Sequence, residues 1–449
     1  MTTLPVLPVL PVDSLVDPHF GLVTGLHPVP RLDGMPPAYV GLTAEVADAR
    51  VHGNWPSDRV SLGTTFGDLA GARIAAIGEA VERYCGNYVP DGLLRGSARE
   101  LAAAGHRLLG PDDLRFFADW QHERPGFPFA RFTEDVEIAW VEGRGDDGPV
   151  LVPASWAHLN WRTGSRRRDP FLHPVNYAGI ATGQDVPDAT RRGLLELVER
   201  DALSLWWHLG LPAAGIDPAG VPGLLDDLAG SRLEVHLLAL PSWFGVPVVA
   251  AVVHDPETGI VAGGFSAKLD PAETARKAVL EAIHSWVFTQ GLLDADGWVF
   301  EAVRAGILSE GLYLPHRPER DYLAIAGEQC AGVRDLGAQA QVWLDPAVQA
   351  ALLPRFTDPG TTVGLDALPV GTEPGLRAAL AAAGHEVVVC ELTTPDIALT
   401  PLRVVRVCAR GLVPNAPAGF PYYGLPRWTD VAGRAPTPAS LLLLPPPSL

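Results

Sequence analysis

The sequence predicts an α+β fold, in which helices and strands intermingle without a regular βαβ rhythm. Three long stretches rich in Ala, Glu and Arg are typical of helices, and short β-rich runs separate them. The chain has 449 residues, of which 47% are hydrophobic and 19% charged, so it is globular and long enough for a large buried core. We expect one large domain with mixed or antiparallel sheets and helices between them.

Residues 1–58 form the first predicted segment, which is rich in proline and glycine and weakly periodic. Proline recurs every third residue in the first dozen, a pattern typical of a polyproline-like arm or a disordered tail. No basic region precedes these residues, which argues against a signal peptide. We therefore expect an N-terminal arm and lead-in over 1–58, and the main domain over 59–449.

Three helices are expected in the main domain. Asp68–Tyr88 lacks proline, and Asp68 is a suitable N-cap; the other two helices are predicted over Pro187–His208 and Pro271–Gln290. The expected strands are Val136–Glu142, Val150–Pro153, Leu233–Leu240, Val246–His254, Ile260–Gly264, Glu386–Leu392 and Leu402–Arg406. Residues 300–380 look helical.

Composition excludes several functional classes. The formal net charge of −18 makes nucleic acid a poor partner, although metal ions can reverse the local sign at an ATP site. No two of the four cysteines share a C-x-x-C spacing, so we expect neither a zinc site nor a disulfide framework, and reduced thiols fit a cytoplasmic location. The longest apolar stretch is interrupted by Pro241, Gly245 and Pro247, which indicates two buried strands and no membrane span.

A repeated E-x-x-E-R motif is the main chemical signal. It occurs once as Glu79, Glu82 and Arg83, and again as Glu196, Glu199 and Arg200. Residues at i, i+3 and i+4 share one face of a helix, so each helix projects two carboxylates and a guanidinium together. The flanking residues are apolar, which predicts that these charges are largely buried.

Buried carboxylates are costly unless they are paired or bound to a metal. Taken singly, each motif is best explained as an internal salt bridge. The repeat favours another explanation, because a third helix adds Lys277 and Glu281 with His284, and the convergence of all three helices would gather about five carboxylates. Magnesium would bridge the carboxylates to phosphates, and the arginines would bind phosphate oxygens, which points to a nucleoside triphosphate.

Other motifs add less. There is no G-x-x-x-x-G-K-[ST] and no G-x-G-x-x-G, and the glycines of 178–183 predict a flexible turn before the second helix. His173, His208 and His254 are interpreted as structural. The run Arg166–Arg168 is interpreted as a solvated surface loop, with a peptide or phosphate contact as the alternative.

These motifs resemble the YcaO family over nearly the whole chain. Its three signatures are similar to residues 75–84, to 179–183 with 194–201, and to 277–281; the end of the chain is also similar, at 392–397, 404–407, 411–414 and 423–427. Leu15–Pro18 and Gly21–Val23 resemble the azoline-forming cyclodehydratase branch.

The resemblance implies an enzyme with ATP and Mg²⁺ as cofactors. In such enzymes a Cys, Ser or Thr side chain of a ribosomally made precursor peptide attacks the preceding amide, and ATP phosphorylates the resulting oxyanion so that it can leave. By position, Glu79, Glu82, Glu196 and Glu199 are implied as metal and ATP ligands. Arg83, Arg200 and Lys277 are implied as phosphate contacts, and Glu281 as a further ATP-site residue.

Three departures from the family pattern stand out. Ala75 replaces the usual serine, and Gly63-Thr64-Thr65-Phe66-Gly67 replaces a Gly-Lys-Gly, so an ATP-contacting lysine is missing. Azoline-forming members often end in a P-x-P-x-P tail that reaches the active site, whereas residues 444–449 read Leu-Pro-Pro-Pro-Ser-Leu. We expect this tail to supply Pro445, Pro447 and Leu449 to catalysis, with a frayed tail as the alternative.

Two other functions stay open: an enzyme that makes thioamides or amidines by the same ATP chemistry, and a non-catalytic scaffold that binds precursor peptide. The expected partners are the precursor peptide and a separate E1-like, leader-peptide-binding protein. A flavin-dependent dehydrogenase that yields azoles is a further implied partner, without a signal of its own in this chain. A homodimer is also expected.

Overall fold

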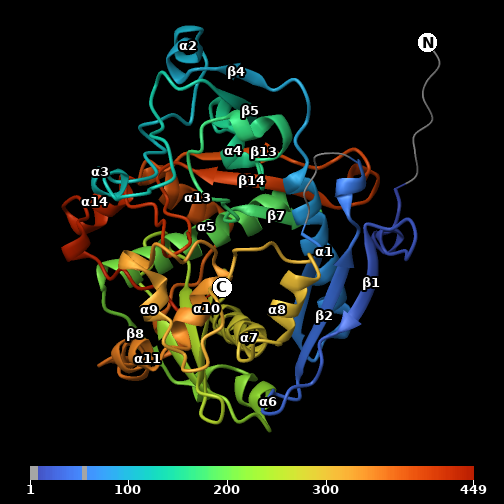
Figure 1. Ribbon diagram of the computed structural model, residues 1–449, viewed down its shortest axis with the longest axis vertical. Coiled ribbons are helices and arrows are strands. Elements are labelled where there is room, and N and C mark those ends of the chain that lie inside the picture. Colours follow the sequence, from blue (N-terminus) through green and yellow to red (C-terminus); the bar gives the residue numbers. More distant parts are fainter. Residues whose placement is uncertain (1–8, 53–57, 449) are drawn as a thin grey trace.

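The computed structural model describes residues 9–52 and 58–448. It has an α+β architecture with three sheets and three long helices between them, so the predicted fold class is confirmed (Figure 1). The division of the chain at residue 58 stays a prediction.

The N-terminal sheet is antiparallel and has the order β1-β2-β3: β1 (Val23–Pro28), β2 (Tyr39–Val46) and β3 (Val60–Phe66). It packs against helix α1, and a Cβ atom at Gly63 would collide with the carbonyl oxygen of Ala72 on that helix. Residues 23–28 and 39–46 of the predicted arm and lead-in therefore form strands, which were not among the expected ones. The polyproline expectation falls largely on residues 1–8, which lie outside the described residues.

The second sheet has the order β11-β10-β9-β8-β12: β8 (Ala214–Ile216), β9 (Glu234–Ala239), β10 (Val248–Asp255), β11 (Ile260–Ala267) and β12 (Thr362–Val363). Only the β12–β8 pair is parallel. Every residue of β11 is buried, because helix α7 covers one face and other segments cover the opposite one. The apolar stretch indeed forms two strands, β9 and β10.

The third sheet is antiparallel with the order β4-β5-β13-β14-β7, and β6 pairs with β5. Its strands are β4 (Leu94–Gly96), β5 (Ile138–Gly145), β6 (Gly148–Pro153), β7 (Ile180–Gly183), β13 (Val387–Glu391) and β14 (Arg403–Ala409). The sheet therefore joins strands from the two halves of the sequence, and α5 packs on β14 and β7.

The three predicted helices are α1 (Leu69–Asn87), α5 (Val186–Leu209) and α7 (Pro271–Gln290). Each begins in the same way: the side chain of an aspartate N-cap accepts the backbone N–H three residues on, which satisfies one of the unpaired donors of the first turn. The caps are Asp68, Asp185 and Asp270. Prolines in the first turn of α5 and α7 remove a further donor, and Gly210 (φ 66°) ends α5 in the left-handed conformation.

Shorter helices complete the structure: α2 (Ala98–Ala103), α3 (Asp119–His122), α4 (Ala154–Ala157), α6 (Leu224–Leu228), α8 (Trp298–Arg304), α9 (Leu323–Ala326), α10 (Gly337–Trp343), α11 (Pro346–Leu352), α12 (Pro354–Thr357), α13 (Glu373–Ala382) and α14 (Arg427–Ala432). Within the described ranges, no helix has the length and apolar character needed to cross a membrane.

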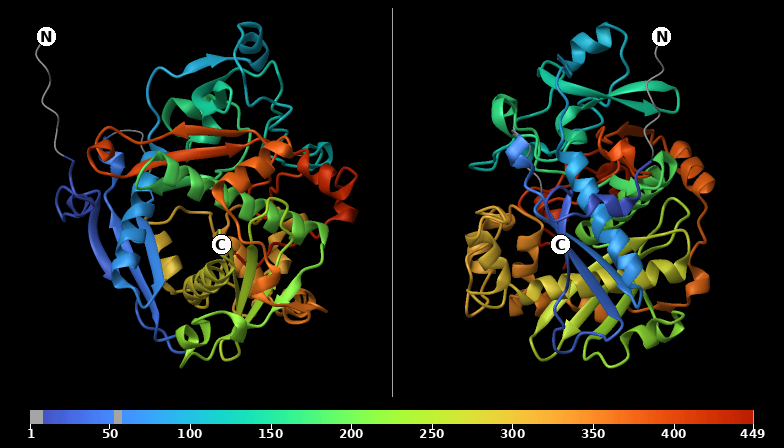
Figure 2. Two further views of the ribbon diagram at one scale, coloured as in Figure 1. Left: turned by 180° about the vertical axis from the view of Figure 1, so that it is seen from behind. Right: turned by 90° about the vertical axis from the view of Figure 1, so that its right-hand side faces the viewer.

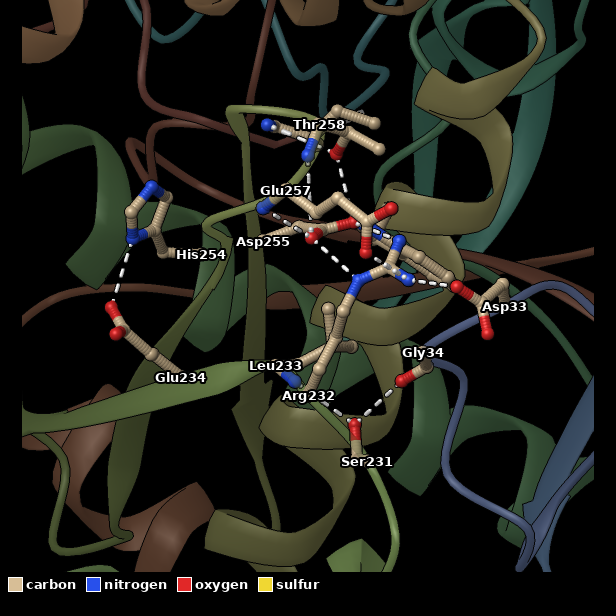
Figure 3. A network of polar contacts seen from close by, with 12 residues as sticks. Asp33, Gly34, Ser231, Arg232, Leu233, Glu234, His254, Asp255, Glu257 and Thr258 are labelled. Atoms are coloured by element: carbon tan, nitrogen blue, oxygen red, sulfur yellow. Dashed lines mark hydrogen bonds and ion pairs between the residues drawn. The ribbon is translucent and has the colours of Figure 1, made fainter.

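A charged network ties the second sheet to the segment before β2 (Figure 3). Asp255 is fully buried at the end of β10 and accepts hydrogen bonds from Arg232 at 2.8 and 3.0 Å. The same guanidinium contacts the exposed Asp33, and Trp286 of α7 donates to Asp255 as well. One buried carboxylate thus holds a hairpin, a helix and an N-terminal loop together.

Candidate functional site

Helices α1, α5 and α7 all contribute residues to one cavity of about 740 Å³. The ribbon can be followed from two further sides in Figure 2. All eight charged residues predicted for the site line this cavity: Glu79, Glu82, Arg83, Glu196, Glu199, Arg200, Lys277 and Glu281. The structure therefore brings together side chains that lie up to 202 positions apart in the sequence.

Backbone N–H groups hold three of these carboxylates in place. In each case Oε2 accepts a hydrogen bond of 3.1 Å from a different part of the fold: Glu79 from Leu62 of β3, Glu196 from Gly179, and Glu199 from Ala267 of β11. In each anchored group the other oxygen, Oε1, faces a motif arginine at 3.5 to 3.8 Å. The helices supply the carboxylates, and the strands orient them.

The two motif arginines are charged neighbours of these glutamates without being hydrogen bonded to them. The Nε of Arg200 lies 3.5 Å from Glu199 and 3.8 Å from Glu196. Arg83 lies 3.5 Å from Glu79 and stacks on the ring of Tyr177 at 4.4 Å. Buried nitrogens of both guanidiniums, Nη1 of Arg83 and Nε of Arg200, have no hydrogen-bond partner among the described residues. These contacts argue against closed internal salt bridges and leave donors for a further anion.

Burial disfavours the ionised form of two of the site carboxyl groups. Burial raises the pKa of Glu82 to about 8 and that of Glu199 to about 7, although Arg83 and Arg200 act in the opposite direction. Glu281 behaves differently, because the Lys277 ammonium beside it more than offsets burial and lowers its pKa. The pair on α7 is thus self-compensated, whereas a further cation beside Glu82 and Glu199 would favour their ionised forms.

The carboxyl groups that line this cavity fit a bound Mg²⁺ with a nucleotide. No three His, Cys, Asp or Glu side chains in the described part of the chain are grouped closely enough to hold a metal by themselves. Phosphate oxygens would have to complete the coordination, as is usual for Mg²⁺. The unpartnered arginine nitrogens are suited to the same phosphates.

The predicted flexible turn over 178–183 is wrong, because Ile180–Gly183 forms strand β7. Only Gly179 has a left-handed conformation (φ 84°), and a Cβ there would collide with the carbonyl oxygen of Val407. Arg406, fully buried, fixes the preceding loop by donating to the carbonyls of Asn176 and Ala178 at 2.9 and 2.6 Å. Sequence reasoning missed this residue, which positions the N–H that orients Glu196.

The C-terminal segment runs into the cavity instead of fraying. The indole of Trp207 donates to the carbonyl of Leu444 at 2.6 Å, and that of Trp343 donates to Pro445 at 2.9 Å. Pro447 accepts the N–H of Gly263 on β11, and Ser448 lines the cavity. Of this tail, Ser448 lines the cavity, whereas Pro445 and Pro447 are not among the lining residues and Leu449 lies outside the described residues, so their role in catalysis stays a prediction.

Two residues that depart from the expected family pattern also lie at the cavity. Ala75 and Thr64 both line the cavity, so the positions are kept and only the side chains differ. Lys268, which follows β11 and was not predicted, also lines it, and burial lowers its pKa. Its position in the sequence gives no sign of this, because the end of β11 meets α7 only in the folded protein.

Comparison with known proteins agrees with this geometry. Residues 67–413, well over half of the chain, match the model of the family described as YcaO cyclodehydratase, ATP- and Mg²⁺-binding. The chain belongs to the YcaO family. The family description confirms the predicted cofactors, ATP and Mg²⁺, and supports the prediction of an ATP-dependent enzyme.

Two curated relatives are uncharacterised proteins. One, from Methanothermobacter thermautotrophicus, is 30% identical over 33% of this chain and 41% of its own length. The other, in the tfuA 3′ region of Rhizobium leguminosarum bv. trifolii, is 26% identical over 49% of this chain and 53% of its own length. The chain thus spans about half the length, or less, of the relatives it matches.

Solved structures share the fold. A heterocyclase in complex with substrate and cofactor has a TM-score of 0.69 and 19% identity, over 97% of this chain and 56% of that one. YcaO from Methanopyrus kandleri, bound with AMPPCP and Mg²⁺, has a TM-score of 0.52 and 21% identity over 87% and 86%. The E. coli microcin synthetase McbBCD complex has a TM-score of 0.55 and 13% identity over 86% and 88%.

Proposed function

We propose that this protein cyclises Cys, Ser or Thr residues of a ribosomally made precursor peptide to thiazolines or oxazolines, with consumption of ATP. The observation that carries the proposal is the single cavity lined by all eight predicted charged residues together with Ser448 of the tail. Resemblance to heterocyclase structures supports it at the level of the fold.

In this proposal the carboxylates of Glu79, Glu82, Glu196 and Glu199 hold Mg²⁺. Arg83, Arg200 and Lys277 bind phosphate oxygens and stabilise the charge that develops on them. Bound ATP supplies the phosphoryl group that turns the amide oxygen into a leaving group.

The peptide would enter beside the tail. Carbonyl groups of this segment are already fixed by Trp207 and Trp343, so the tail presents a rigid edge to the cavity. We propose that the end of the tail, including Pro445, Pro447 and Leu449, positions the reacting residue or accepts its proton. Burial of Ser448 (7% exposed) supports a placed tail over a frayed one.

The test is mass spectrometry of a candidate precursor after incubation with the protein, Mg-ATP and the separate leader-binding partner that we expect. Loss of one water per ring, together with peptide-dependent release of ADP and phosphate, supports the proposal. Exchange of oxygen for sulfur would instead support the thioamide-forming alternative. No peptide-dependent phosphate release with the complete partner set would leave only a scaffold role.

A further inference from the structure

A second cavity, of about 220 Å³, lies between the segments 155–163 and 170–175 and shares no lining residue with the first. Its walls are mainly apolar and include Leu159, Trp161, Phe171 and Val175. A cavity of about 150 Å³ is enough for a benzene ring. The second cavity therefore has room for one aromatic side chain.

Two polar groups face this apolar space. His158 lines the cavity and is only 4% exposed. Burial lowers the pKa of His158 to about 3, although a hydrogen bond with the backbone of Tyr88 acts in the opposite direction. The imidazole is thus neutral and keeps at least one ring nitrogen for a ligand.

The second polar group is the hydroxyl of Ser155. Nδ1 of His173 lies 2.7 Å from the carbonyl oxygen of Pro174, so it must carry the proton and donate it. Nε2 of His173 is then the acceptor for the Ser155 hydroxyl, 3.1 Å away. The Ser155 oxygen keeps lone pairs that can accept a hydrogen bond from a ligand.

The rim of the cavity is strongly basic in a chain of net charge −18. Arg162 stacks on Phe171 at 4.5 Å and Arg166 on Trp161 at 5.3 Å, while Arg167 and Arg168 are exposed. None of these four arginines forms an ion pair with a residue that the structure describes. The nearby Asp169 is paired with Arg95 instead, at 2.9 Å. The segment beside the cavity therefore carries four arginines, of which Arg162 lines the cavity and Arg166 is attracted to Asp169 and Asp91.

The two cavities are close along the chain. Val175 lines the second cavity and Tyr177 the first, and two residues of backbone span at most about 7 Å. A peptide whose reacting residue lies in the first cavity can thus reach the second with a few further residues. This continuity favours the substrate peptide as the occupant.

We propose that the second cavity is an exosite for the precursor peptide, which receives a tyrosine side chain from an acidic stretch. The apolar walls take the ring, and the phenol hydroxyl donates to and accepts from His158 and Ser155. Arg162 and Arg166–Arg168 attract the flanking acidic residues. The substrate identity rests on the proposed function, while the binding chemistry of the exosite does not.

The test is the fluorescence anisotropy of the full-length protein titrated into the labelled peptide Gly-Glu-Asp-Tyr-Asp-Glu at low salt, without ATP. We expect saturable binding, at least tenfold weaker when the tyrosine is replaced by alanine or the acids by their amides. Val175→Trp, at the exposed cavity wall, and the double variant Arg167→Glu/Arg168→Glu should each weaken binding at least tenfold. Val370→Trp and Arg99→Glu, on other exposed surfaces, should bind like the unaltered protein.

Equal binding of the alanine peptide, or unaltered binding by Val175→Trp, would overturn the exosite, as would tighter binding of an oligothymidylate of similar length. The measurement needs no turnover, so a missing azoline product would refute the proposed function and leave this result standing. With a true precursor, Val175→Trp should raise KM and leave kcat unchanged. An unchanged KM would contradict the assignment of the site to that substrate.

Discussion

At the scale of single residues, the decisive geometry is that of the two motif arginines. Nε of Arg200 lies within 4 Å of two carboxylates, and it donates no hydrogen bond to either of them. A structural ion pair normally has the shorter contacts seen between Arg232 and Asp255. This geometry supports the proposal that the Arg200 guanidinium binds phosphate oxygens.

The variant Arg200→Lys tests this interpretation, because it keeps the charge and removes the planar fork. We expect the peptide-dependent ATPase kcat/KM to fall by about 100-fold or more, with the melting temperature changed by only a few degrees. Arg276→Lys, at an ion pair with Asp227 outside the cavity, is the matched control. Equal ATPase kcat/KM values for both variants would mean that the planar guanidinium of Arg200 stabilises the fold and does not act on a ligand.

Crowding of carboxylates gives a second prediction at this scale. Because Glu82 is buried beside like charges and its pKa is raised, the ionised side chain destabilises the protein without ligand. Glu82→Gln should raise the melting temperature of the ligand-free protein by a few degrees and remove most of the stabilisation by Mg-ATP. Thermal melts with and without Mg-ATP measure both effects. A fall in the ligand-free melting temperature would mean that Glu82 is adequately paired by Arg83.

At the scale of elements, strand β11 packs against both helix α7 and the C-terminal tail. Gly264 allows α7 to pack closely, and the neighbouring Gly263 faces the tail, where an added Cβ would lie 2.8 Å from Pro447. The tail can dock only because this strand has no side chain at that position.

Gly263→Val should therefore displace residues 441–448 and reduce azoline formation as strongly as removal of the tail. Hydrogen exchange of the tail amides should increase, since Leu442 N and its neighbours lose their fixed partners. Gly220→Val is the control, because a Cβ at Gly220 meets nothing within 4 Å. A tail that stays protected in Gly263→Val would refute the docking role of this glycine.

Elements with strong local signals could be predicted from the sequence, whereas others could not. The bounds of α7 agree with the prediction because Asp270 and Pro271 mark its start unambiguously. Strands β1 and β2 were missed, since glycine and proline interrupt their alternation and their pairing is non-local. Six of the charged site residues followed from the repeated helical motif and Lys277 and Glu281 from the third predicted helix, but Lys268 and Arg406 reach the site only through tertiary packing.

At the scale of the whole molecule, buried histidines couple stability to pH. Burial lowers the pKa of His158 to about 3, and of His173 and His208 to about 4. A base with a lowered pKa binds fewer protons in the folded state than in the unfolded one. The stability that such a histidine contributes is fully present above its unfolded pKa of about 6.5. This stability is lost as pH falls through the range between 6.5 and 4.

The free energy of unfolding should therefore fall by up to about 4 kcal/mol per pH unit between pH 6 and 4, the limit for three protons. Urea unfolding followed by tryptophan fluorescence at several pH values gives this slope. His208→Gln should reduce the slope of unfolding free energy against pH by the share of one proton, about a third of that limit. An unchanged slope would show that His208 does not differ in protonation between the folded and unfolded states.

The Arg232–Asp255 network gives a further prediction for the whole molecule, because it links three distant segments (Figure 3). Arg232→Ala leaves the buried Asp255 without its cation and should cost about 3–5 kcal/mol of unfolding free energy. Asp33→Ala removes only a carboxylate that is 91% exposed and should cost less than about 1 kcal/mol. If urea unfolding shows that both variants lose a similar amount of unfolding free energy, then the burial of Asp255 does not determine how much Arg232→Ala destabilises the protein.

The docked tail also has a consequence for biosynthesis on the ribosome. Trp207 precedes its tail partner Leu444 by 237 residues and Trp343 precedes Pro445 by 102, so each indole waits for a long further stretch of synthesis. At common translation rates this interval is on the order of ten seconds. During that time two indoles at the heart of the nascent protein lack their final partners, so this stage of synthesis is where chaperones would have most to protect.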